Sequence, residues 1–402
     1  MAGVFCFIVC FRFYVICISK TIRFMKKILF SLFIWLPLFT MAQKKDKSAT
    51  PKVYDLLIGG YTAPDGNRGI TVYRFYAETG RFAFLGEVET ASPTFLCISA
   101  DRKFVYSVNA VAEGGVSAFS FDYNSGALKF INKQSSVGAN PAHIAIDKDA
   151  KNVIVSSYGN GKLSVLPINK DGSLASATQT IVGEGSSIIP QRQAGSHIHS
   201  AIFSPDQKHV LYADLGTDKV SIARYKAGKV PALTPGDVAF EKVKPGSGPR
   251  HMDFSPDGKF LYLVNEMAAT VNSYAYEKGK ITFIDSVGLA SPGFTGRSSA
   301  ADIHVSPDGR FLYATNRGTA NEIVVYAVDQ ASGKLKYLTR YPTGKEPRNF
   351  VIEPGGHYLL LAAQQSNTVQ IYRIDKQTGI LIEMNNPISI PTPTVLKLVS
   401  AE

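Results

Sequence analysis

Short apolar runs recur along almost the whole chain, and in each repeat two such runs flank a tight-turn sequence. The best copies are GPRHMDFSPDGKFLYLVNE (248–266) and AADIHVSPDGRFLYATNRG (300–318). In both, a strand leads to Ser-Pro-Asp-Gly, where Pro fixes φ and Asp and Gly tolerate the remaining turn angles, and a second strand follows. Weaker copies start at Ser92, Asn140, Ser196 and Glu346.

The spacing of the copies identifies the kind of repeat. Their turn positions are separated by 48, 57, 51, 51 and 47 residues and fall at Asp101, Asp149, Asp206, Asp257, Asp308 and Gly355. A period of about fifty is typical of a propeller blade. Two more strands complete each unit, such as 269–277 and 279–287 in the fourth copy, and the period-2 pattern excludes a helical solenoid.

The two ends of the chain complete one further unit. Residues 53–62 (VYDLLIGGYT) and 69–75 (GITVYRF) match the second and third strands of a blade, and 391–400 (PTPTVLKLVS) match a first strand. Joining them closes the ring and removes the exposed edges of an open sheet. The pattern therefore predicts an all-β fold, a seven-bladed β-propeller with four-stranded blades, closed by the C-terminal strand joining the N-terminal blade.

The first 42 residues differ from the rest, since they contain no Asp or Glu. From Met25, two lysines precede an apolar stretch, and Ala42 is a small residue suited to cleavage, as in a secretory signal peptide. We therefore expect three segments: a leader at 1–42 with its true start at Met25, a polar linker at 43–51 and a propeller domain at 52–402. The protein is expected to be periplasmic or secreted, without stable membrane contact after cleavage; an uncleaved anchor is the alternative.

Composition excludes several other classes. With 45% hydrophobic and 19% charged residues the chain is globular, and removing the leader's five basic residues lowers the net charge from +11 to +6. That excess forms no arginine-rich helix, so we expect no nucleic-acid partner. Only Cys97 would remain after cleavage, and we expect this cysteine of an apolar strand to be a core residue. A single cysteine excludes a disulfide framework and a thiolate metal site. A glycine-rich phosphate loop and a nucleophile elbow are also missing from the sequence.

Candidate chemistry lies where the repeated strands meet the mouth of the propeller, because the first strand of a blade starts and the second ends on one face. The first-strand position reads Thr94, Ala142, His199, Arg250, Ala301 and Arg348, with His143 and His251 one position later. The second-strand position reads Tyr61, Ala110, Tyr158, Leu215, Glu266, Arg317 and Gln364. Scaffold positions repeat one residue type, whereas these do not, which indicates an asymmetric ligand site.

The residue types at the mouth suggest their roles. Fork-shaped donors for a carboxylate or phosphate are Arg250, Arg317 and Arg348. Candidate proton acceptors are His197, His199, His251 and Glu266, and Asp214 is a candidate to orient a histidine. The alternatives are structural: core histidines, interblade ion pairs, or Glu266 paired with Arg317, which would still orient the guanidinium. Two histidines without a third ligand give little support to zinc.

Several long motifs resemble, in order, the propeller-type 6-phosphogluconolactonase family, which includes the fungal carboxymuconate cycloisomerase. Besides the two best copies, they are GSHIHSAIFSPD (195–206) and EPRNFVIEPGGHYLLLAAQQSNTVQIYRID (346–375). The resemblance covers about residues 53–399 and implies hydrolysis of a sugar-acid lactone without metal or cofactor. It implies that His199 or Glu266 draws a proton from water while an arginine stabilises the oxyanion.

The resemblance and the residue columns together give the expected site. We expect the catalytic residues to be His199, Glu266 and Arg250. We expect the substrate-binding residues to be His197, His251, Arg317, Arg348, His143 and Asp214.

The family activity predicts 6-phosphogluconolactone as the substrate of a monomeric enzyme. Because the pentose phosphate pathway is cytoplasmic and 25–42 looks like an export signal, two alternatives stay open. One is an exported lactonase for another lactone, unphosphorylated or carboxylated. The other is a non-catalytic periplasmic propeller that binds an anionic sugar. A quinone- or metal-dependent sugar dehydrogenase is disfavoured, since no cofactor motif is present.

Overall fold

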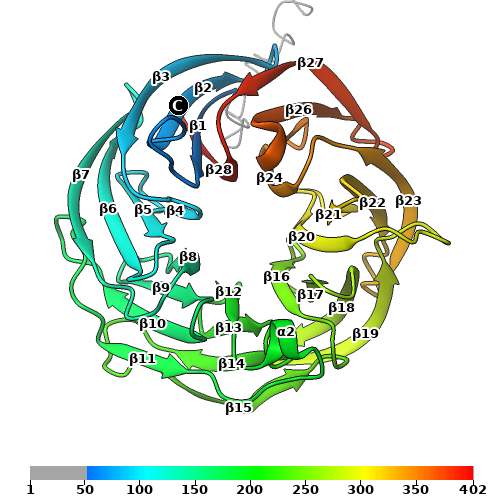
Figure 1. Cartoon of the computed structure of the whole chain (residues 1–402), viewed down its shortest axis with the longest axis horizontal. Coiled ribbons are helices and arrows are strands. Elements are labelled where there is room, and N and C mark those ends of the chain that lie inside the picture. The colour runs from blue at the N-terminus through cyan, green and yellow to red at the C-terminus, as the bar shows by residue number, and fades with distance from the viewer. Residues whose placement is uncertain (1–51, 402) are drawn as a thin grey trace, which may run out of the picture. The chain divides into compact units, whose positions relative to one another are not determined.

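The computed structural model describes residues 52–401, which form seven four-stranded antiparallel sheets arranged as a ring (Figure 1). The predicted seven-bladed, all-β propeller is confirmed. The predicted leader and linker lie outside the described residues.

The blades follow one another in chain order. In blades 2 to 7 the four strands are consecutive in the chain and run from the centre of the ring outward, whereas the innermost strand of blade 1 is the C-terminal strand. Blade 1 contains β28 (Pro393–Ser400), β1 (Val53–Gly60), β2 (Gly69–Tyr76) and β3 (Arg81–Glu89). Blade 2 contains β4 (Leu96–Ile98), β5 (Phe104–Asn109), β6 (Gly115–Asp122) and β7 (Ala127–Gln134). Blade 3 contains β8 (Pro141–Ile146), β9 (Asn152–Ser157), β10 (Lys162–Pro167) and β11 (Gln179–Val182). Blade 4 contains β12 (Ile198–Phe203), β13 (His209–Asp214), β14 (Lys219–Tyr225) and β15 (Leu233–Lys242).

The remaining three blades have the same order of strands. Blade 5 contains β16 (Pro249–Phe254), β17 (Phe260–Asn265), β18 (Thr270–Glu277) and β19 (Lys280–Gly288). Blade 6 contains β20 (Ser298–Val305), β21 (Phe311–Gly318), β22 (Glu322–Val328) and β23 (Leu335–Pro342). Blade 7 contains β24 (Pro347–Ile352), β25 (Tyr358–Ala363), β26 (Thr368–Ile374) and β27 (Leu381–Ser389).

The ring is closed by pairing between the two ends of the chain. β28 is antiparallel to β1, with Leu56 opposite Leu398 and Ile58 opposite Leu396 (Figure 1). The C-terminal strand therefore supplies the missing first strand of blade 1, as the sequence predicts. Leu396 and Val395 are buried, so this strand also carries core contacts.

Burial decreases from the centre of each blade to its edge. All six residues of β17 are buried, whereas exposed and partly buried positions dominate β19 at the rim. Strands in the middle of a blade lie between neighbouring blades and are apolar on both faces, which explains their continuous hydrophobic runs. The outermost strand has one face toward water, so its sequence is more polar.

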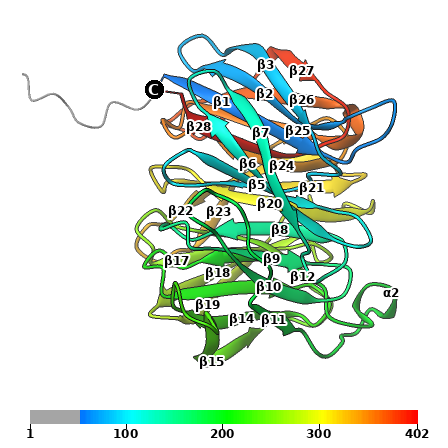
Figure 2. The same ribbon diagram turned by 90° about the vertical axis from the view of Figure 1, so that its left-hand side faces the viewer.

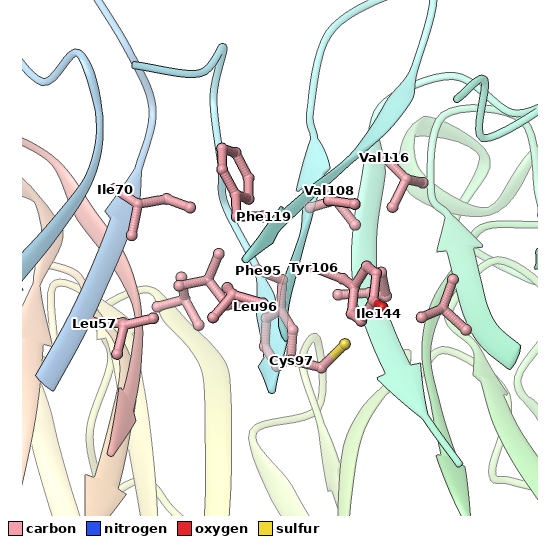
Figure 3. Packing of buried hydrophobic residues seen from close by; sticks show 14 of the residues in the cluster. Leu57, Ile70, Phe95, Leu96, Cys97, Tyr106, Val108, Val116, Phe119 and Ile144 are labelled. Carbon is pink, nitrogen blue, oxygen red and sulfur yellow. The ribbon is translucent and has the colours of Figure 1, made fainter. Parts of the chain in front are cut away.

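The hydrophobic core lies between blades. One cluster joins Leu57 and Ile70 of blade 1, Leu96 of blade 2 and Ile144 of blade 3 (Figure 3). Cys97 lies in this cluster and is 7% exposed, and burial raises the pKa of its thiol to about 12. The interpretation of this cysteine as a core residue is confirmed.

The turns between first and second strands share one hydrogen bond. In four blades a Ser hydroxyl donates to the turn Asp at 2.6–2.7 Å, as from Ser255 to Asp257. Blades 3 and 7 place a carboxylate at the Ser position, where Asp147 and Glu353 accept backbone N–H groups of the turn. These groups form turns outside the mouth site, which is the role that the sequence assigns to the turn aspartates.

Two short helical segments interrupt the strand pattern. α2 (Pro190–Gln193) lies in the connection between β11 and β12, and η1 (Gln364–Ser366) follows β25. Figure 2 shows α2 projecting beyond the strands on one face of the ring. Within residues 52–401, no helix is long and apolar enough to cross a membrane.

Removing the closing strand should destabilise the whole propeller. A chain ending at Thr392 loses the buried contacts of Val395 and Leu396 and exposes the edge of β1. We expect its thermal unfolding midpoint to fall by at least about 10 °C, or the protein to aggregate. A chain that lacks only Ala401 and Glu402 is the control. An unchanged midpoint in the shorter chain would contradict closure by β28.

Candidate active site

A cavity of about 340 Å³ opens where the inner strands begin, and all seven blades contribute to its wall. Its charged and aromatic lining residues are Tyr61, Phe95, Tyr158, Arg192, His199, Arg250, His251, Glu266, Arg317 and Arg348. Small and neutral side chains complete the wall, among them Thr94, Ala142 and Thr394. The structure thus brings six of the nine predicted site residues to one cavity: His199, Arg250, His251, Glu266, Arg317 and Arg348.

Glu266, directly after β17, accepts hydrogen bonds from Arg192 and Arg250 and forms an ion pair with Arg317 as well. Its Oε1 lies 2.7 Å from Arg192, and its Oε2 lies 3.0 Å from Arg250 and 3.2 Å from Arg317. Burial alone would raise the pKa of this carboxyl, but Arg317, Arg250 and the Arg192 hydrogen bond lower it to about 2. The expected alternative of a Glu266–Arg317 pair is present, and two further arginines join it.

Arg250 and Arg317 are held in fixed positions. Arg250 is 2% exposed and donates from Nε to Glu266 and from a terminal nitrogen to the carbonyl of Ala301 on the next blade. Arg317 donates to the carbonyl and hydroxyl oxygens of Ser299 at 3.1 and 2.9 Å. Burial, followed by the neighbouring guanidinium, lowers the pKa of Arg250 to about 9. Both groups are preorganised donors on the cavity wall.

Arg348 differs from Arg192, Arg250 and Arg317, each of which forms an ion pair with Glu266. It donates to Gln364 at 3.3 Å and to the Tyr61 hydroxyl at 3.4 Å, and its guanidinium lies 5.5 Å from the centre of the Tyr61 ring. Among residues 52–401 it has no carboxylate within ion-pair distance. Four arginines therefore face one glutamate, and the cavity has a strong excess of positive charge.

His199 occupies the first-strand position in blade 4, and its side chain lines the cavity as predicted. It is buried, and its Nδ1 has no hydrogen-bond partner among the described residues. Its ring lies edge-on to Tyr158 at 5.6 Å and to His251 at 5.2 Å between centroids. Burial, and then the charge of Arg250, lowers the pKa of His199 well below 6.5. The ring is therefore neutral near pH 7 and offers a nitrogen lone pair.

His251 lines the cavity and also belongs to a network of histidine and aspartate side chains. Its Nδ1 lies 2.7 Å from Asp302, which is 2% exposed and also accepts from the side-chain amide of Asn349. The second oxygen of Asp302 lies 3.3 Å from His304, which in turn lies 3.5 Å from Asp253. Burial opposes charge on His304, but the two carboxylates raise its pKa to about 10. The network joins blades 5, 6 and 7.

Three predicted site residues lie outside the cavity lining. His143 packs against the Phe95 ring, with 4.1 Å between centroids. His197 stacks on Tyr158 at 4.6 Å and its Nδ1 lies 2.7 Å from the Tyr158 carbonyl. Asp214 accepts from the backbone N–H of His197 at 2.8 Å, so it holds the backbone of this histidine and not its ring. His143 and His197 thus each pack against an aromatic residue that lines the cavity.

Arg192 and Asp302 belong to the site or its network but are not among the residues predicted from the sequence. Asp302 occupies the same strand position as His143 and His251, so comparing that whole column would have found it. Arg192 lies outside the repeated strands. The 57-residue interval between Asp149 and Asp206, longer than the others, marks the inserted segment that contains it.

Within residues 52–401, no group of three or more His, Cys, Asp and Glu side chains is arranged to hold a metal ion. The fold and the cavity together define a propeller with a basic cavity at its centre.

Comparisons with known proteins identify the family. Residues 55–398 match the model described as "Lactonase, 7-bladed beta-propeller", and the chain belongs to this family. It is 38% identical to a 6-phosphogluconolactonase of Formosa agariphila over 81% of this chain and 94% of that protein. It is 34% identical to a 6-phosphogluconolactonase of Bacillus subtilis over 85% and 97%. The chain is therefore an enzyme of the lactone-hydrolysing class, a carboxylic ester hydrolase.

Solved structures agree with this assignment. A periplasmic gluconolactonase of Pseudomonas aeruginosa superposes with a TM-score of 0.82 at 34% identity, covering 87% of this chain and 100% of that one. A candidate 6-phosphogluconolactonase of Bacteroides fragilis superposes with a TM-score of 0.84 at 38% identity, covering 88% and 100%.

Replacing Glu266 by Gln should damage both stability and activity. The change removes the counter-charge of buried guanidinium groups, so we expect a loss of about 3 kcal/mol in the free energy of unfolding. Displaced arginines should lower kcat/KM by about a hundredfold. Urea unfolding and steady-state kinetics measure the two effects. Glu89→Gln, which removes an exposed ion pair with Arg68, is the control and should leave both nearly unchanged. A Glu266→Gln protein as stable as the parent would contradict the role assigned to the carboxylate.

Proposed function

We propose that the protein hydrolyses an anionic sugar-acid lactone in the central cavity, with 6-phosphogluconolactone as the first candidate substrate. The observation that carries this proposal is the set of four arginines around a cavity with a single carboxylate. A surplus of buried guanidinium charge costs free energy unless an anion binds there. A phosphate or carboxylate on the substrate meets this requirement, and the names of the relatives support a sugar lactone.

In the proposed mechanism His199 accepts a proton from water as the water oxygen attacks the lactone carbonyl carbon. Arg250 stabilises the oxyanion that forms, because its guanidinium is buried and already positioned. The ring C–O bond then breaks, and the proton passes from His199 to the departing oxygen. Arg317 and Arg348 hold the phosphate or carboxylate of the substrate.

The environment of Glu266 favours His199 over Glu266 as the base. A carboxyl with a pKa of about 2 accepts a proton from water poorly, and three arginines already occupy its oxygens. Burial and the nearby arginines hold the pKa of His199 well below 6.5, so its ring is neutral. We therefore assign to Glu266 the task of holding the arginines in place.

We further propose that the protein is exported through the leader at 1–42 and acts as a monomer. The periplasmic gluconolactonase of Pseudomonas aeruginosa is a relative with this location in its name, which supports export. An unphosphorylated sugar lactone is accordingly the second candidate substrate for this chain. Residues 1–42 contain no Asp or Glu, as expected for a secretory leader.

The pH dependence of catalysis tests the role of His199. Because burial and the nearby arginines lower its pKa well below 6.5, the neutral, proton-accepting form persists on acidification past pH 6.5. We expect kcat/KM to stay constant from pH 7.5 to below pH 6.5 and to fall only at more acidic pH. Initial rates, corrected for spontaneous lactone hydrolysis, give the profile. An acid midpoint at or above 6.5 would argue against His199 as the base.

The decisive test of the function is direct hydrolysis by protein beginning at Gln43. Freshly prepared 6-phosphogluconolactone and glucono-δ-lactone are compared in a pH-stat, where each turnover releases acid. We expect turnover of the phosphorylated lactone and a loss of about 10²–10³-fold in kcat with Arg250→Ala. Arg81→Ala, on the exposed outer strand β3, is the matched control. Lack of turnover on both lactones would remove the proposed substrates and favour a different lactone.

A further inference from the structure

One of the seven connections between blades differs from the rest. Each leads from the outermost strand of a blade to the innermost strand of the next, on the face where the cavity opens. The connection between β11 and β12 covers 183–197 and is the longest, whereas the one between β15 and β16 covers only 243–248. Figure 2 shows that it carries α2 beyond the strands on one face of the ring. This connection brings Arg192 to the cavity from outside the repeated blade.

A buried glutamine anchors the connection next to Arg192. Gln193 is fully buried and donates to the carbonyl of Leu215 at 2.9 Å and to Asp218 at 2.8 Å. Asp218 also accepts from the backbone N–H groups of Gly246 and Gly248, both at 2.7 Å. Gly248 immediately precedes β16, which carries Arg250. The residue next to Arg192 and the segment before β16, which carries Arg250, are therefore hydrogen-bonded to the same carboxylate, that of Asp218.

The Arg192 side chain lies at the rim of the cavity. It is 42% exposed, whereas the side chains of Arg250 and Arg317 are 2% and 9% exposed. One of its terminal nitrogens donates to Glu266 at 2.7 Å and to the Tyr158 hydroxyl at 3.2 Å. Its Nε and its other terminal nitrogen have no hydrogen-bond partner among the described residues. Most of this fork therefore remains available to a ligand.

We propose that Arg192 is a specificity-determining residue that selects a lactone with an anionic group over a neutral one. The proposal rests on the lactone hydrolysis proposed above and extends it to a residue outside the blade repeat. A phosphate or carboxylate at the far end of the substrate receives the free N–H groups of Arg192. Glu266 meanwhile keeps Arg250 and Arg317 in place. A neutral sugar lactone gains nothing from this contact.

The test compares Arg192→Ala and Arg192→Lys with the parent protein on 6-phosphogluconolactone and glucono-δ-lactone. For the phosphorylated lactone we expect KM to rise about tenfold in Arg192→Ala, with kcat changed less than about threefold. KM for glucono-δ-lactone should stay within about twofold. Arg192→Lys keeps a point charge without the fork, so its KM should fall between those of the parent and Arg192→Ala.

Arg297→Ala is the matched control, because Arg297 is exposed on the corresponding connection between β19 and β20 and does not line the cavity. It removes the same charge from the same face and should leave both KM values unchanged. A thermal unfolding midpoint for each variant confirms that the fold is intact. A tenfold loss in Arg297→Ala as well would reduce the effect to general electrostatic attraction and overturn the proposal.

Two outcomes separate this proposal from the proposed function. If the parent protein hydrolyses lactones but shows no preference for the phosphorylated one, or Arg192→Ala keeps that preference, the role of Arg192 is wrong and lactone hydrolysis stands. If no lactone is turned over, the proposed function fails. The role of Arg192 is then tested by measuring the affinities for 6-phosphogluconate and gluconate by calorimetry. A selective loss of 6-phosphogluconate affinity in Arg192→Ala supports the proposal. An equal change in both affinities overturns it.

Discussion

The pairing of β28 with β1 is the contact on which the rest of the molecule depends. It joins strands from opposite ends of the chain and turns a row of blades into a ring. Only a closed ring brings the start of each inner strand to one place, and the cavity takes residues from all seven blades. Closure also removes the free edges that would otherwise invite association with other chains. Stability and site geometry therefore share one cause.

Within that ring, the scaffold repeats and the site does not. The turn aspartates and the apolar interblade residues recur from blade to blade, because each blade must pack against its neighbours in the same way. At the mouth, side chains point into shared space and are free to differ. One blade offers His199, the next Arg250 and Glu266, and the next Arg317. Asymmetric chemistry is thus built on a symmetric frame without disturbing its core.

Charge balance gives the cavity its chemical character. Glu266 neutralises part of a four-arginine cluster and keeps the guanidinium groups apart and oriented. Burial, reinforced by the remaining positive charge, lowers the pKa of His199, so the imidazole is a neutral acceptor beside permanent donors. His304 lies between Asp302 and Asp253 and has a raised pKa. The two histidines therefore differ in charge, since burial and nearby arginines disfavour the proton on His199, whereas two carboxylates retain it on His304.

The repeat pattern of the sequence is sufficient to predict the fold and much of the cavity wall. The period-2 pattern of apolar residues predicts the individual strands. The recurrence of turns about every fifty residues predicts the blades and their number. The strand positions of His199, Arg250, Glu266, Arg317 and Arg348 follow from the same alignment, because equivalent positions in a propeller face the same centre. Apart from the Glu266–Arg317 pair, the polar contacts of the site follow only from the folded structure. Arg192 binds Glu266 from an inserted segment 74 positions away in the chain. Asp302 of blade 6 pairs with the ring of His251 of blade 5. The ring of His197 lies against Tyr158 and does not line the cavity. Such contacts depend on side-chain directions and loop paths, which are fixed by packing in the closed ring and leave no periodic trace in the chain.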